Sequence, residues 1–177
     1  MKKYLLVIFS LLLIFTVFGC NKKDESTNQQ TGNSQNQQAP AKVNVQSMKV
    51  LNVEDYKLMM QEHVGKIVLL NFFGSWCPPC KAETPDFVQV YEKYKDKNNF
   101  IIIGIAVDDD QSKALEFVNT YGVTYPVYQA DRSLLSYFAI NPIPTSFVFD
   151  KDGNLLDSMV GYMSKNIVER IAQFGGE

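Results

Sequence analysis

The chain has 177 residues, of which 46% are hydrophobic and 20% are charged, and its formal net charge at pH 7 is −2. This length and composition suffice for one well-packed domain. A net charge so close to zero provides no electrostatic field for nucleic acid, so we expect no nucleic-acid partner. The sequence therefore predicts one folded domain, which we expect to be monomeric.

The first 19 residues have the layout of an export signal. Lys2 and Lys3 form a basic start, and an almost entirely apolar run over residues 4–18 follows. The alternative is an uncleaved membrane anchor, but the run is shorter than the roughly 20 residues that span a bilayer. We therefore predict a signal peptide over residues 1–19.

The sequence VFGC at 17–20 resembles the lipobox of bacterial lipoproteins, whose cysteine becomes the lipid-modified first residue. The resemblance implies that Cys20 is lipidated, that the chain is anchored to a bacterial membrane and that its domain works outside the cytoplasm. Two acyl chains would give a stable anchor, whereas one binds only marginally. From Asn21 to about Gln46 the chain has almost no large apolar side chains, so we predict a flexible tether over residues 20–46.

Residues 47–177 alternate between two kinds of apolar pattern, which predict strands and helices. The predicted strands are residues 67–73, 101–107, 126–129, 145–150 and 155–160, and the predicted helices are residues 79–96, 111–121, 131–139 and a last one capped by Ser164 and ending at Gly175. The sequence DKDGN at 150–154 predicts a hairpin turn. This order is typical of an α/β fold with an antiparallel hairpin at the edge of its sheet.

The stretch NFFGSWCPPCKAETPDF, residues 71–87, places Cys77 and Cys80 where the first long strand ends and a helix begins. That edge of the sheet is where α/β proteins place their sites. A structural zinc site is disfavoured, because it needs about four ligands and His63 is the only histidine. We therefore expect no metal.

Two interpretations of the cysteine pair remain open. A structural disulfide would persist outside the cytoplasm, but it would close only a very short loop and stabilise little. Redox chemistry fits the position better, because a helix N-terminus lowers the pKa of a thiol. In that interpretation Cys77 faces out and is the nucleophile, Cys80 is the resolving thiol, and no cofactor is needed beyond their redox-active disulfide. Pro78 and Pro79 suit a helix start and stiffen the loop between the sulfurs.

The motif WCPPC after an apolar strand, a helix interrupted by Pro85, and the sequence NPIPTSFVFDKDG at 141–153 resemble the thioredoxin superfamily. More narrowly, they resemble its extracytoplasmic TlpA/ResA-like branch. The resemblance implies a thioredoxin-like three-layer fold with a central mixed sheet and an extra β-α insertion at about residues 101–125. It also implies a cis peptide bond before Pro144, which would lie against the cysteines, and a backbone at Ile143 that pairs with an extended substrate.

The same resemblance implies a thiol-disulfide oxidoreductase. Its substrates would be disulfides of exported proteins, apocytochrome c among them, and a membrane thiol carrier would supply its electrons. We expect Trp76 to shield the sulfurs and contact the partner, with plain packing as the alternative.

Proton transfer is one point at which the chain departs from thioredoxin. Thioredoxins have a buried aspartate where this chain has Asn71, which cannot titrate. Asp109 falls where a ResA-like glutamate would lie and is our first candidate for the proton acceptor; Glu83, one turn into the helix, is the second. For both, the alternative is a solvated surface carboxylate.

Two other functions remain as alternatives. A peroxide-reducing enzyme of the peroxiredoxin type would share the fold. However, peroxiredoxin-like sites have a threonine three residues before the attacking cysteine, and this chain has Gly74 at that position. A non-catalytic binding lipoprotein with a structural disulfide would show no thiol exchange.

Overall fold

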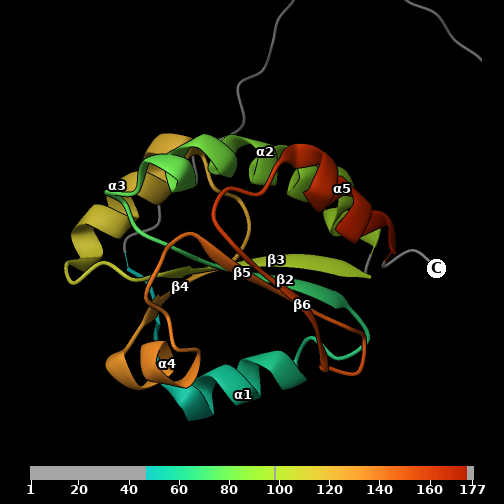
Figure 1. Cartoon of the computed structure of the whole chain (residues 1–177), viewed down its shortest axis with the longest axis horizontal. Coiled ribbons are helices and arrows are strands. Elements are labelled where there is room, and N and C mark those ends of the chain that lie inside the picture. The colour runs from blue at the N-terminus through green and yellow to red at the C-terminus, as the bar shows by residue number, and fades with distance from the viewer. Residues whose placement is uncertain (1–46, 98, 175–177) are drawn as a thin grey trace, which may run out of the picture. The chain divides into compact units, whose positions relative to one another are not determined.

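The structure is a computed structural model that describes residues 47–97 and 99–174 (Figure 1). The predicted signal peptide, Cys20 and tether lie outside the described residues. The helices and strands are, in chain order, β1 (Val50–Leu51), α1 (Val53–Gln61), β2 (Ile67–Phe73), α2 (Pro78–Tyr94), the 3-10 helix η1 (Lys95–Lys97), β3 (Phe100–Ala106), α3 (Gln111–Tyr121), β4 (Val127–Ala130), α4 (Arg132–Tyr137), β5 (Thr145–Phe149), β6 (Leu155–Val160) and α5 (Lys165–Phe174).

The strands form one mixed sheet in the order β1-β4-β3-β2-β5-β6. β1, β4, β3 and β2 run parallel to one another, whereas β5 pairs antiparallel with both β2 and β6. The hairpin between β5 and β6 turns at the predicted DKDGN sequence, where Gly153 has a φ of 84° and the N–H of Asp150 donates to the C=O of Asn154 at 2.9 Å. The predicted α/β class and the antiparallel hairpin at the sheet edge are confirmed.

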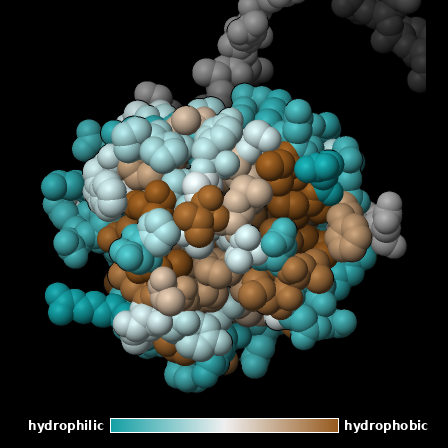
Figure 2. Space-filling view, viewed as in Figure 1, coloured by the Kyte–Doolittle hydropathy of each residue, from teal (hydrophilic) through white to brown (hydrophobic). Residues whose placement is uncertain are grey.

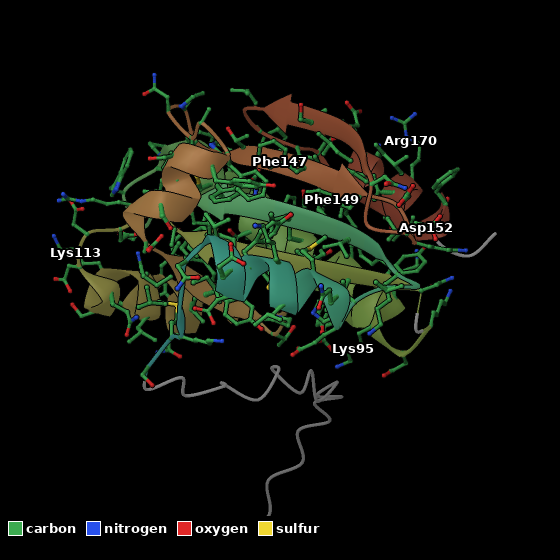
Figure 3. The ribbon with its side chains drawn as sticks, turned by 90° about the horizontal axis from the view of Figure 1, so that it is seen from below. Lys95, Lys113, Phe147, Phe149, Asp152 and Arg170 are labelled. Carbon is green, nitrogen blue, oxygen red and sulfur yellow. A yellow bond between two sulfur atoms is a disulfide. The ribbon has the colours of Figure 1, made fainter. Side chains whose placement is uncertain are left out.

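Helices cover both faces of the sheet: α2, α3 and α5 lie on one face, and α1 and α4 lie on the other (Figure 1). Every residue of β2 and β3 is buried, as expected for strands covered on both sides. Phe147 and Phe149 of β5, labelled in Figure 3, pack on the α1 and α4 side. The predicted three layers are therefore confirmed.

The side chains of β2 divide between two hydrophobic clusters because successive residues of a strand point to opposite faces. Leu69 and Phe73 belong to the cluster that includes residues of α2 and α5, whereas Leu70 and Phe72 belong to the cluster that includes residues of α1. Asn71 has the same parity as Leu69 and Phe73. The polar side chain in the middle of β2 therefore faces the layer that contains α2.

β1 and α1 were not predicted from the sequence. β1 is only two residues long, and only Tyr56 and Met59 of α1 are buried, so the apolar spacing in this helix is weak. The available signal was Asn52, whose side chain caps α1 by accepting the N–H of Asp55 at 2.9 Å. The other predicted elements are present, although α2 begins at Pro78 and continues through Pro85.

The sheet ends at β6, where apolar side chains gather on the surface together with α5 (Figure 2). Leu156 and Phe174 are both exposed there. A pocket of about 410 Å³ lies between the two elements. None of the predicted site residues lines this pocket.

Candidate active site

The two cysteines of the WCPPC motif lie at the N-terminus of α2 and are joined by a disulfide bond. Cys77 is the N-cap residue, and its Sγ accepts the backbone N–H of Cys80 at 3.2 Å. Pro78 and Pro79 occupy the first two helical positions, where a backbone N–H would have no partner within the helix. The predicted position of the pair at a helix start is confirmed, and the Cys77 sulfur lies at the positive end of the helix dipole.

Both cysteines are buried in this disulfide-bonded state. Only 2% of Cys77 is exposed, and Cys80 is fully buried. The expectation that Cys77 faces out is therefore wrong for the oxidised chain. The physical reason is the bond itself, which ties the Cys77 sulfur to a fully buried partner.

The Ile143–Pro144 peptide bond is cis, as the resemblance implied. Pro144 is buried, and its C=O accepts the N–H of Gly161 at 2.8 Å. The Ile143 side chain lies beside the loop that leads into the disulfide, because a Cβ added at Gly74 would be only 2.9 Å from Ile143 Cδ1. The segment before β5 thus reaches the cysteine loop, while pairing of the Ile143 backbone with a substrate stays a prediction.

Trp76 is 64% exposed although it directly precedes the buried Cys77. Its ring also lies close to Gly74, at 3.1 Å from a Cβ added there. An aromatic side chain that remains mostly in solvent contributes little to the core, so plain packing does not explain this residue. Its contact with a partner protein stays a prediction.

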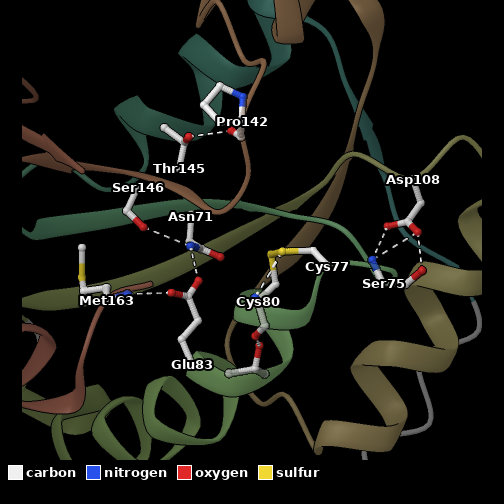
Figure 4. The surroundings of a disulfide bond; sticks show 11 residues. Asn71, Ser75, Cys77, Cys80, Glu83, Asp108, Pro142, Thr145, Ser146 and Met163 are labelled. Atoms are coloured by element: carbon white, nitrogen blue, oxygen red, sulfur yellow. Dashed lines mark hydrogen bonds between the residues drawn. A yellow bond between two sulfur atoms is a disulfide. The ribbon is translucent and has the colours of Figure 1, made fainter. Parts of the chain in front are cut away.

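Asn71 connects three elements beside the disulfide (Figure 4). Its Nδ2 donates one hydrogen bond to Glu83 Oε1 on α2 at 3.0 Å and one to Ser146 Oγ on β5 at 3.0 Å. All three residues are buried. These two hydrogen bonds hold the buried amide in this orientation as long as both partners accept.

Glu83 is a buried carboxyl, with only 1% of the residue exposed. Its Oε2 accepts the backbone N–H of Met163 at 2.9 Å. Burial raises the pKa of Glu83 from its usual 4.5 to about 7, although the hydrogen bonds from Met163 and Asn71 act in the opposite direction. The alternative of a solvated surface carboxylate is therefore wrong for Glu83.

Glu83 also lies on the same side of α2 as Cys80. It follows Cys80 by three residues, and residues at this spacing are neighbours on a helix surface. Both side chains are buried, and Figure 4 shows them below the same stretch of β2. A carboxyl with a pKa near 7 in this position can take up and release a proton at neutral pH.

The three aspartates after β3 have different surroundings. Asp108 is buried and accepts the backbone N–H of Ser75 at 3.0 Å as well as the Ser75 hydroxyl. Asp109 is exposed, and its side chain makes no hydrogen bond or ion pair to another described residue. Asp110 caps α3 by accepting the N–H of Ser112. A role for Asp109 in proton transfer stays a prediction, and Glu83 replaces it as our first candidate.

Sequence analysis missed three residues around the disulfide. Asp108 was placed at the correct edge, but Asp109 was preferred; the strand alternation at the end of β3 could have separated the two. Ser146 is the second residue of β5 and follows Pro144 by two residues, and this closeness to the predicted cis-proline was the available signal. Met163 takes part through its backbone N–H, for which no side-chain pattern gives a signal.

Within residues 47–97 and 99–174, no group of three or more histidine, cysteine, aspartate and glutamate side chains is arranged to hold a metal ion. In the same part of the chain, no helix has both the length and the apolar character needed to cross a bilayer.

Comparisons with known proteins give the chain its family. The model of the AhpC/TSA family matches residues 36–158. A protein named thiol-disulfide oxidoreductase ResA from Bacillus thuringiensis (strain Al Hakam) is 36% identical over 114 residues, which are 64% of this chain and 65% of that protein. The protein of the same name from Bacillus subtilis (strain 168) is 30% identical over 113 residues, or 63% of each chain. The chain thus spans less than two thirds of the length of these curated relatives.

A solved structure agrees with these matches. The crystal structure of a thiol:disulfide interchange protein of the thioredoxin family from Chlorobium tepidum TLS is 37% identical, with a TM-score of 0.61. The match covers 65% of this chain and 83% of that one. The chain therefore belongs to the AhpC/TSA family of thioredoxin-fold proteins, among its ResA-like members.

Proposed function

We propose that the chain is a thiol-disulfide oxidoreductase that exchanges electrons with protein disulfides through Cys77 and Cys80. The observation that carries this proposal is the disulfide at the N-terminus of α2, three residues before the buried Glu83. The names of the curated relatives and of the solved structure support the same activity.

The first step is attack by Cys77. In the reduced chain its thiolate attacks one sulfur of a substrate disulfide, which forms a mixed disulfide and releases the other substrate sulfur as a thiolate. Two features favour the thiolate of Cys77: it caps α2, and it lies within hydrogen-bond reach of the N–H of Cys80. Both lower the pKa of a thiol.

The second step is resolution by Cys80. Its thiol gives a proton to the Glu83 carboxylate, and the resulting thiolate attacks Cys77 Sγ. The second substrate sulfur leaves as a thiolate, so the substrate gains two electrons and the chain ends with the Cys77–Cys80 disulfide. Glu83 suits this role because its pKa of about 7 leaves both of its protonation states populated near neutral pH.

Substrate contacts would come from the surface around the cysteine loop. Trp76 offers an exposed aromatic ring next to Cys77, and Ile143 lies beside the same loop. We expect the Ile143 backbone to pair with an extended substrate segment next to Pro144. Pro78 and Pro79 would keep the loop between the two sulfurs stiff.

The direction and the location of the reaction belong to the proposal. We propose that the chain reduces disulfides of exported proteins, apocytochrome c among them, with electrons from a membrane thiol carrier. The support is the resemblance to the TlpA/ResA-like branch, together with the predicted export signal and the lipobox-like sequence at residues 1–20. A lipid on Cys20 would tether the domain to the membrane.

The peroxide-reducing alternative has less support. Its threonine position is Gly74, where even a Cβ would approach Ile143 Cδ1 to 2.9 Å. A side chain of threonine size at that point would require the loop or Ile143 to shift.

The proposed function can be tested by mixing the reduced, purified full chain with insulin whose disulfides are intact and counting the thiols that appear on insulin. We expect two thiols per wild-type chain, and none from Cys77→Ala. The absence of transfer from the wild type would refute the proposed function, and transfer by Cys77→Ala would refute the role of Cys77.

A further inference from the structure

Ser146 is a member of the buried hydrogen-bond network around Glu83. It lies directly opposite Asn71 in the antiparallel register of β5 and β2. The network also connects Glu83 on α2 and the backbone of Met163 before α5. Ser146 thus lies on the strand that follows Pro144. It contacts Asn71, which in turn donates a hydrogen bond to Glu83, the proposed proton acceptor.

The Asn71 carboxamide is oriented by its two acceptors. One N–H points to the Glu83 carboxylate, and the other points to the Ser146 hydroxyl oxygen. Figure 4 shows the Asn71 oxygen on the side where the disulfide lies. This arrangement suits an ionised Glu83, because a carboxylate oxygen can only accept hydrogen bonds.

When Glu83 is protonated, Asn71 must offer it a hydrogen-bond acceptor instead of a donor. A hydrogen on Glu83 Oε1 would face the N–H of Asn71, which is also a donor. Rotation of the carboxamide by about 180° relieves this conflict, since its oxygen can then accept the Glu83 O–H. That oxygen also faces Ser146, whose hydroxyl can turn from acceptor to donor, whereas a methyl group can do neither.

We propose that Ser146 is a positioning residue for proton transfer at Glu83, because its hydroxyl accepts from Asn71 when Glu83 is ionised and donates to the rotated Asn71 carboxamide when Glu83 is protonated. The inference rests on the proposed function, in which Glu83 takes the proton of Cys80. The rotation turns the N–H groups of Asn71 toward the disulfide side, where the Cys80 thiolate forms.

Few titratable groups surround this network. Tyr125, in the segment before β4, interacts with Glu83; burial, followed by this interaction, raises the pKa of the tyrosine, so it stays neutral near pH 7. α2 contributes Cys77 and Cys80, which do not titrate while they form the disulfide. β2, β5 and the segment before α5 contribute Asn71, Ser146 and the Met163 N–H, none of which is charged.

Replacement of Ser146 by alanine shifts the balance between the two states in a definite direction. With Glu83 ionised, one buried N–H of Asn71 loses its acceptor. With Glu83 protonated and Asn71 rotated, the Asn71 carbonyl oxygen loses the hydrogen bond from Ser146. It keeps the hydrogen bond from the Glu83 O–H. A buried N–H without a partner is the rarer and costlier defect, so the substitution favours protonated Glu83.

The test is a titration of the Glu83 carboxyl in the oxidised, purified full chain, followed by carboxyl carbon NMR. We expect Ser146→Ala to raise the midpoint by roughly one pH unit. Ser146→Thr, which keeps the hydroxyl, should restore the wild-type midpoint. Ser158→Ala, at an exposed serine of β6, is the control and should have no effect.

The same substitution in an Asn71→Ala variant tests whether Ser146 acts through Asn71. In Asn71→Ala, the further change Ser146→Ala should leave the Glu83 midpoint where it is. The same shift in both backgrounds, or no shift from Ser146→Ala in the wild type, would overturn the inference. If Ser146→Ala does not fold, Ser146→Cys, a near-isosteric and weaker hydrogen-bonding replacement, should raise the midpoint in the same direction.

The titration uses the oxidised chain and requires no thiol exchange, so its outcome is independent of the insulin assay. In the reduced chain, the pH profile for resolution of the mixed disulfide should move with the Glu83 midpoint in Ser146→Ala. A profile that stays in place while the midpoint moves would refute the role of this network in proton transfer and leave the thiol exchange itself intact.

Discussion

Asp108 holds Ser75, two residues before Cys77, through both the backbone and the side chain of that serine. Asp108 Oδ2 accepts the N–H of Ser75 at 3.0 Å, and Oδ1 accepts its hydroxyl. The backbone C=O of Asp108 in turn accepts Gln129 Nε2 on β4 at 2.7 Å. The loop that leads into the disulfide is thereby attached to the segment that follows β3.

Asp108→Ala should destabilise the oxidised chain by roughly 1–3 kcal/mol, because it leaves the N–H of Ser75 without its acceptor. Urea denaturation measures the change. Asp109→Ala is the matched control, and we expect it to cost less than about 0.5 kcal/mol because Asp109 is exposed. Equal costs for the two variants would show that Asp108 does not hold the loop.

Glu83 should make the stability of the chain depend on pH. Its pKa is about 7 in the folded chain and near its usual 4.5 in the unfolded chain, so between these values the folded chain holds a proton that the unfolded chain has lost. The free energy of unfolding should therefore fall as pH rises from about 4.5 to about 7, by roughly 3 kcal/mol from this group.

Glu83→Gln should remove that contribution, since glutamine does not titrate. Urea denaturation of both oxidised chains from pH 4 to pH 8 gives the comparison, with the exposed Glu62→Gln as control. If wild type and Glu83→Gln have the same pH dependence, Glu83 does not titrate in this range in the folded chain.

Trp76→Ala should slow exchange with protein disulfides several-fold while leaving exchange with a small disulfide such as oxidised glutathione almost unchanged. The reason is that an exposed ring beside Cys77 adds contact area for a protein partner. Initial rates with the two substrates give the measurement. Leu58→Ala removes an exposed apolar side chain from α1, across the sheet from α2, and should slow neither. Equal slowing with both substrates would argue against a role in partner contact.

Cys20→Ser should release the chain from the membrane fraction of a bacterial host, if Cys20 carries the lipid anchor. Wild type should remain with the membranes after a salt wash, since an acylated chain is not held by charge. Immunoblots of soluble and membrane fractions report the outcome. Retention of Cys20→Ser in the membranes would indicate an uncleaved anchor or another attachment.

The parts of the fold that the sequence predicted best are those with a strong local pattern. β2 and β3 are long apolar runs buried on both faces, and the proline pair with Cys77 identified the start of α2. β1 could not be predicted because a strand of two residues forms no pattern, and α1 could not be predicted because most of its residues are exposed. The cis bond before Pro144 came from the family resemblance, since most bonds before proline are trans.

The site was harder to predict than the fold. The motif identified Cys77 and Cys80 without any long-range information. The choice between Asp109 and Glu83 depended on burial, which for Glu83 comes from a segment about 80 residues later in the chain that contributes the Met163 N–H. No local pattern carries such a contact, so the sequence alone placed Glu83 second among the candidate proton acceptors.

The most direct test of the account is the site of the mixed disulfide in a chain that cannot complete the reaction. Reduced Cys80→Ala is mixed with an aromatic disulfide such as dithiobis-nitrobenzoate, and the adduct is located by peptide mass spectrometry. We predict a stable adduct on Cys77, whereas wild type should return to its intramolecular disulfide and release the reagent. Rapid adduct formation on Cys80 in the Cys77→Ala chain, with Cys77 in Cys80→Ala unreactive, would contradict the assignment of nucleophile and resolving thiol.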